Sequence, residues 1–151
     1  MTAPPPATTT TSPTVSPQRM RAARSLAAAI AAVTAATSLA FFFAPGFTFD
    51  NIATYMPRND HLLADLGAFQ LAVAVALGGF ALRPDQRLGL WVAVSAQSVH
   101  AFSHIRDDLI SEVEGSKGFT SAAPNIVSWA LVVAVVVLAT PRPDRSAGAE
   151  P

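Results

Sequence analysis

The sequence predicts an all-α protein in which four helices form a transmembrane up-down bundle with both chain ends in the cytoplasm. Three observations lead to this fold class. Hydrophobic residues make up 51% of the chain and charged residues only 13%, whereas a soluble domain carries about 25% charged residues. Four apolar runs each approach the ~20 residues that a helix needs to cross a bilayer. Arginines are concentrated in alternate segments between these runs.

The first apolar run, residues 25–44, has no charged residue and ends before Pro45. It follows a Pro/Thr/Ser-rich tail (1–18), which we expect to be disordered because it lacks the apolar residues of a folded core. A cleaved signal peptide would also combine a basic flank with an apolar run. This run is long for a signal peptide, however, and no A-x-A site follows it, so we favour a membrane span.

Three further runs complete a transmembrane domain at 19–140, and a second disordered tail follows at 141–151. Turn residues such as Pro84 separate the runs. Buried helices of a soluble protein are the alternative, but four such runs would leave too little polar surface to cover them. The remaining predicted spans are 62–82, 88–105 and 122–140.

The basic residues predict the orientation of the helices. If the spans alternate, seven arginines fall on one side: Arg19, Arg21, Arg24, Arg83, Arg87, Arg142 and Arg145. The other side has only Arg58, Arg106 and Lys117, together with most of the acidic residues. The positive-inside rule places the arginine-rich side in the cytoplasm. We therefore expect a multi-pass protein of the bacterial plasma membrane with outer loops at about 45–60 and 106–121.

Composition and motifs exclude several kinds of function. The chain has no cysteine, which rules out disulfides, cysteine-ligated clusters and cysteine nucleophiles. Its net charge is zero and gives no reason to expect nucleic acid as a partner. The catalytic patterns HExxH, Walker A and GxSxG are absent. The sequence therefore leaves open whether the protein is an enzyme.

All three histidines are predicted near the outer face, with aspartates beside them. At about 100° per residue, His61 and Asp65 share one face of the second span. On the third span, a wedge about 80° wide contains Gln97, His100, His104 and Asp107. A short loop joins these spans, so they should be antiparallel neighbours. The candidate metal ligands are His61, Asp65, His100, His104 and Asp107.

Such a cluster has several possible roles. Imidazoles with a carboxylate can ligate a transition metal. The same groups could hydrogen-bond the carbonyls of a quinone and exchange protons with it, or belong to an ion path. The simplest interpretation is that they only hold helices together, with Asn59 or Asp60 capping the second span. Residues 46–57 could be an amphipathic lid over the site, although we favour an ordinary loop.

Two segments resemble a known family. NDHLLADLGAFQLAVAVAL (59–77) and VHAFSHIRDDL (99–109) are similar to small, actinobacterial-type four-helix membrane proteins of the DoxX-like group. The matching positions are Asp60, His61, Asp65, Gly67, His100 and His104. Better-studied relatives partner quinone-linked oxidoreductases, so the resemblance implies a subunit of a membrane redox complex. A non-enzymatic scaffold or accessory subunit is the alternative.

Overall fold

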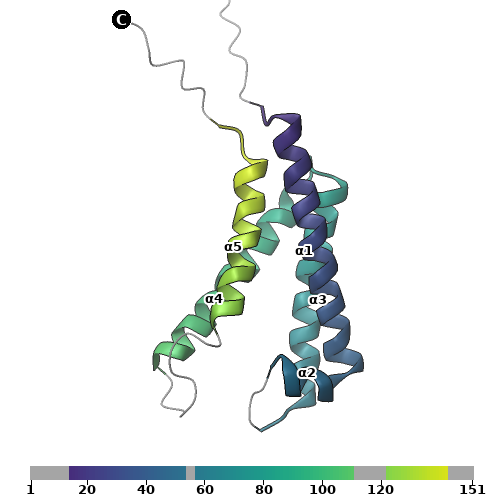
Figure 1. Ribbon diagram of the computed structural model, residues 1–151, viewed down its shortest axis with the longest axis vertical. Coiled ribbons are helices and arrows are strands. Elements are labelled where there is room, and N and C mark those ends of the chain that lie inside the picture. Colours follow the sequence, from purple (N-terminus) through teal and green to yellow (C-terminus); the bar gives the residue numbers. More distant parts are fainter. Residues whose placement is uncertain (1–13, 54–56, 111–121, 143–151) are drawn as a thin grey trace, which may run out of the picture.

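The chain is all-helical in the part that the computed structural model describes, residues 14–53, 57–110 and 122–142 (Figure 1). This part contains four long helices, and one short helix follows the first of them. Their bounds are α1 Pro17–Phe43, α2 Pro45–Asn51, α3 Asp60–Leu82, α4 Leu88–Ile110 and α5 Ala122–Ala139.

Each predicted apolar run lies within one long helix, apart from Ala44 and Thr140, which directly follow α1 and α5. The all-helical class is therefore confirmed. α1 begins before its apolar run, because Pro17 suits a first helical position and the Ser16 hydroxyl accepts a hydrogen bond from the Arg19 amide. Asn59 caps α3, as predicted, by accepting a hydrogen bond from the Leu62 amide at 3.1 Å. The greater part of both predicted disordered tails lies outside the described residues.

Three of the helices, α1, α3 and α5, are long and apolar enough to cross a membrane. Their outer faces carry large apolar side chains, with Val33 68%, Phe43 83% and Val75 69% exposed. Extended apolar surface of this kind is typical of contact with lipid. α4 has 23 residues, but its C-terminal part also contains Arg106, Asp107 and Asp108.

α1 and α3 pack side by side over most of their lengths, and α4 packs against α3 and α5. Gly67 of α3 permits the close approach to α1, because a Cβ atom there would lie 3.0 Å from the Cβ of Phe41 and from the Ser38 carbonyl oxygen. Figure 1 shows α4 diverging from α3 toward the end opposite the start of α1, with α5 beside it.

The main core joins α1, α3, α4 and α5 toward the end where α1 begins. Its most buried large side chains come from three helices: Leu77, Phe80, Leu90, Val132 and Val135. A smaller apolar cluster of Phe41, Ala53 and Leu63 lies beside α2 at the opposite end.

Two arginines of α1 connect its N-terminal part to the ends of two other helices. Arg24 Nε donates a hydrogen bond to the Ala81 carbonyl of α3 at 2.8 Å, and Arg19 donates to the Val137 carbonyl of α5. Carbonyls in the last turn of a helix have no partner within that helix. α3 and α5 therefore both end beside the start of α1, and α4 runs in the opposite direction between them.

Candidate functional site

His100 lies where three helices meet. Its ring is half-buried, and the centroid lies 5.4 Å from that of Phe69 on α3 and 4.8 Å from that of His104 on α4. The Asn125 side chain of α5 is hydrogen-bonded to it. His100 therefore contacts side chains of α3, α4 and α5.

The predicted wedge on α4 is only partly directed into the protein. Gln97 is buried, with 1% of its surface exposed, and its Nε2 donates to Gln70 Oε1 of α3 at 3.4 Å. Asp107, in contrast, has a 63% exposed side chain that lies 3.9 Å from Arg106. Gln97 and His100 face the neighbouring helices, whereas Asp107 faces outward.

His61 and Asp65 form a separate pair on α3. Their Nε2 and Oδ2 atoms are 3.7 Å apart, and their side chains are 87% and 65% exposed. The structure thus pairs His61 with Asp65 and His100 with His104, but it does not gather all five candidates. Among the described residues, no three His, Cys, Asp or Glu side chains are placed to hold a metal ion.

A cleft of about 370 Å³ opens between α3 and α4 beside His100. Most of its wall is apolar, and its polar groups are an imidazole and a hydroxyl. The Ser103 hydroxyl already donates to the His100 carbonyl at 2.8 Å, and its oxygen can still accept a hydrogen bond. The lining residues are Leu66, Phe69, Ala96, Val99, His100 and Ser103.

Phe69 and Ser103 were not among the residues proposed from the sequence. Each lies about one helical turn from a residue that was proposed, Asp65 and His100 respectively. Their spacing placed both on the predicted faces. Neither residue type indicates a metal site, because neither a phenyl ring nor a neutral hydroxyl is a usual ligand.

Polar contacts also join α4 to α5. Trp129 Nε1 donates to the Ser98 hydroxyl at 3.0 Å, and the first amide of α5, at Ala122, donates to Asp108 Oδ2 at 3.0 Å. A carboxylate at a helix N-terminus satisfies an amide that lacks a partner within the helix and also meets the positive end of the helix dipole. Asp108 therefore has a clear structural role.

The segment after α1 is not an ordinary loop, so that prediction is wrong for residues 45–51. Pro45 ends α1 but also suits the first position of a helix, and α2 starts there. Thr48 of α2 is buried, and its hydroxyl donates to the Pro45 carbonyl at 3.1 Å. No residue lining the cleft belongs to α2, so α2 does not form its lid.

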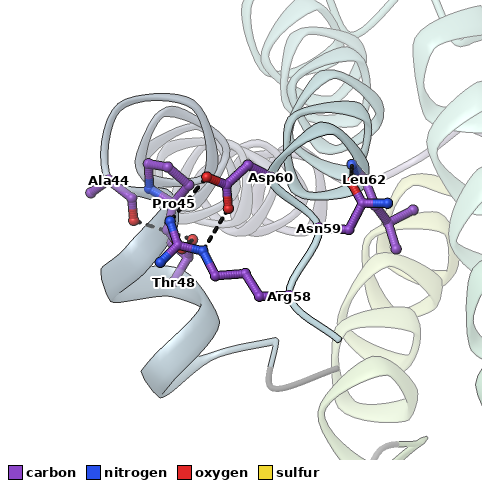
Figure 2. Close-up of polar contacts among 7 residues, drawn as sticks. All are labelled: Ala44, Pro45, Thr48, Arg58, Asn59, Asp60 and Leu62. Atoms are coloured by element: carbon purple, nitrogen blue, oxygen red, sulfur yellow. Dashed lines mark hydrogen bonds and ion pairs between the residues drawn. The ribbon is translucent and has the colours of Figure 1, made fainter. Parts of the chain in front are cut away.

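An ion pair lies where the connection from α2 meets the start of α3 (Figure 2). Arg58 forms two hydrogen bonds to Asp60, with Nε–Oδ1 at 2.6 Å and Nη2–Oδ2 at 3.0 Å. The hydrogen bonds to Asp60 raise the pKa of the Arg58 guanidinium, so Arg58 stays positively charged. Figure 2 shows the pair beside the first turn of α2 and at the N-terminus of α3.

Comparisons of the chain with family models, curated proteins and solved structures find no match. The DoxX-like resemblance therefore depends only on the short segments quoted above.

Proposed function

We propose that the protein is a four-span protein of the bacterial plasma membrane, with both ends in the cytoplasm. The hydrogen bonds from Arg19 and Arg24 support four spans, because they place the ends of α3 and α5 on the same side. Between these ends the chain must return across the same layer, and α4 is the helix that runs back. The arginine-rich side then faces the cytoplasm.

Cysteine labelling tests this topology, because the natural chain contains no cysteine. We expect a membrane-impermeant maleimide to label Asp50→Cys on α2 in intact cells. Asp85→Cys, in the connection between α3 and α4, should react only after permeabilisation. Labelling of Asp85→Cys from outside, or of both positions from the same side, would contradict the four-span arrangement.

We further propose that the cleft between α3 and α4 binds a quinone-class headgroup, as an accessory subunit of a membrane redox complex would. The observation that carries this proposal is the His100 ring, which lies against Phe69 in an otherwise apolar wall. A quinone headgroup is flat and apolar, and its carbonyls accept hydrogen bonds. Binding sites commonly combine an apolar wall with a few polar groups in this way.

Two features of the cleft suit a ligand that arrives from the bilayer. Val99 on its wall is 70% exposed, so the cleft opens to the protein surface where lipid would lie. Neutral imidazole has one donor and one acceptor nitrogen. One of them bonds Asn125, and the other is left for the carbonyl of a quinone or the hydroxyl of a quinol. The chain would bind and orient the headgroup, while electron transfer would be performed by a partner.

Quinone binding can be measured on the purified protein with a short-tailed quinone analogue. His100→Ala should weaken binding about tenfold, because a hydrogen bond is worth roughly 1 kcal/mol and part of the aromatic wall is lost. His61→Ala removes an exposed imidazole outside the cleft and should leave binding unchanged. Wild-type protein that does not bind the analogue, or equal losses in both variants, would refute the proposal.

A second candidate is a non-enzymatic scaffold in which the polar residues only join helices. The contacts of Asp108 with the Ala122 amide and of His100 with Asn125 favour it. A metal at His100 and His104 would need a further ligand, and no described His, Cys, Asp or Glu is placed to provide one. If His100→Ala lowers thermal stability and the wild type binds no quinone analogue, the scaffold interpretation is preferred.

A further inference from the structure

The end of the molecule where α1 begins carries a marked excess of positive charge. Among the described residues, six arginines lie at this end and Asp85 is the acidic residue there. At the other end, Arg58 and Arg106 are outnumbered by five aspartates: Asp50, Asp60, Asp65, Asp107 and Asp108. The six arginines are Arg19, Arg21, Arg24, Arg83, Arg87 and Arg142.

Five of these arginines divide into two groups, and Arg87, which is half-buried, belongs to neither. Arg19 and Arg24 are already engaged, since they donate to the last-turn carbonyls of α5 and α3. Arg21, Arg83 and Arg142 are exposed, and within the described part of the chain none of them forms a hydrogen bond or an ion pair. We call these three the basic rim.

The helix ends hold the basic rim together. Arg83 directly follows α3 and lies two residues beyond the carbonyl that Arg24 binds, while Arg142 follows α5 and Arg21 lies between the two engaged arginines. The contacts that place the start of α1 beside the ends of α3 and α5 therefore also bring three unengaged guanidinium groups to one end of the molecule.

Apolar surface lies directly next to this charge. Leu82 and Leu88, on either side of the turn that contains Arg83, are 79% and 76% exposed. A ligand with an anionic head and apolar chains could contact the arginines and the leucines together. A soluble anion could use only the arginines.

We propose that the basic rim binds the phosphate groups of anionic phospholipids, with their acyl chains along the apolar faces of α3 and α4. A guanidinium group matches the geometry of phosphate oxygens and can bind two of them together. Positive side chains near an anionic leaflet each favour association about fivefold. This proposal rests on the membrane spans proposed above, but not on the cleft or on its ligand.

Lipid association can be tested with the full-length protein in phosphatidylcholine vesicles that contain trace spin-labelled lipids. We expect spin-labelled phosphatidylglycerol to associate at least about fivefold more strongly than spin-labelled phosphatidylcholine at low salt, the effect of a single arginine. High salt should reduce this preference. In the triple variant Arg21→Gln/Arg83→Gln/Arg142→Gln, the ratio of phosphatidylglycerol to phosphatidylcholine association should fall toward one.

The matched control is Arg58→Gln/Arg106→Gln, which removes the two arginines of the opposite end and should preserve the preference. Equal helicity by circular dichroism will show that the variants fold. If the triple variant does not fold, the three single variants replace it, and each should lower the preference in part. Equal association of both lipids with the wild type, or full preference in the variants of the basic rim, would overturn the proposal. Loss of the preference on addition of inorganic phosphate at constant ionic strength would assign the rim to a soluble anion and also overturn it.

Discussion

Replacing Gly89 with alanine is expected to lower the free energy of unfolding by about 1–3 kcal/mol, as overpacking a close contact does. A Cβ atom at this position would lie 2.5 Å from the carbonyl oxygen of Ala76 and 3.2 Å from its carbonyl carbon. These are backbone atoms in the middle of α3, so they cannot rotate away like the end of a side chain. The helices must separate at this point, with loss of contacts around Leu90.

Unfolding in detergent, followed by circular dichroism during thermal or denaturant titration, measures this effect. Gly79→Ala is the matched control, since no atom lies within 4 Å of an added Cβ there. That variant should be at least as stable as the wild type, because alanine is favoured over glycine in a helix by up to ~1 kcal/mol. Equal stability of the two variants would show that α3 and α4 do not approach closely at Gly89.

Replacing Arg24 with glutamine is expected to destabilise the protein by about 1.5–3 kcal/mol, the range for a hydrogen bond to a charged group. Arg24 Nε donates to the Ala81 carbonyl in the last turn of α3, and this hydrogen bond is part-buried. A cation there also interacts favourably with the negative end of the helix dipole. Glutamine removes the charge and shortens the side chain, so the carbonyl loses its donor.

Arg21→Gln provides the control for this experiment, because Arg21 is exposed on the same helix and has no described partner. Measured in zwitterionic detergent, its stability should stay within about 0.5 kcal/mol of the wild type. If both variants lose the same stability, general charge at this end, and not the bond to Ala81, stabilises the fold.

The helices could be predicted because their causes are local. The four apolar runs contain Ala27, Leu77, Leu90 and Val135 respectively. These residues are among the most buried of their helices. Asn59 was recognisable as a helix cap from its residue type and place. α2 was not foreseen, because Pro45 and Gly46 indicate the end of a helix and the same proline also suits the start of the next.

The candidate site was predictable only within each helix. Spacing along α3 and α4 showed that His61 faces the same side as Asp65, and that His100 faces the same side as His104. Whether the two pairs meet depends on the relative rotation and crossing angle of the helices. The spacing of residues along one helix does not determine either of these. In the structure, His100 is adjacent to Phe69, whereas His61 and Asp65 remain exposed.

The sequence by itself therefore determined where the four long helices lie, and that α1, α3 and α5 are apolar enough for a bilayer, because chain period and side-chain hydrophobicity are local properties. Only the tertiary structure decided which polar groups meet. Contacts such as Gly89 against Ala76 and Arg24 against Ala81 join residues far apart in the chain. They set how closely the helices approach and which ends lie together, and these distances decide whether the candidate ligands form one cluster or separate pairs.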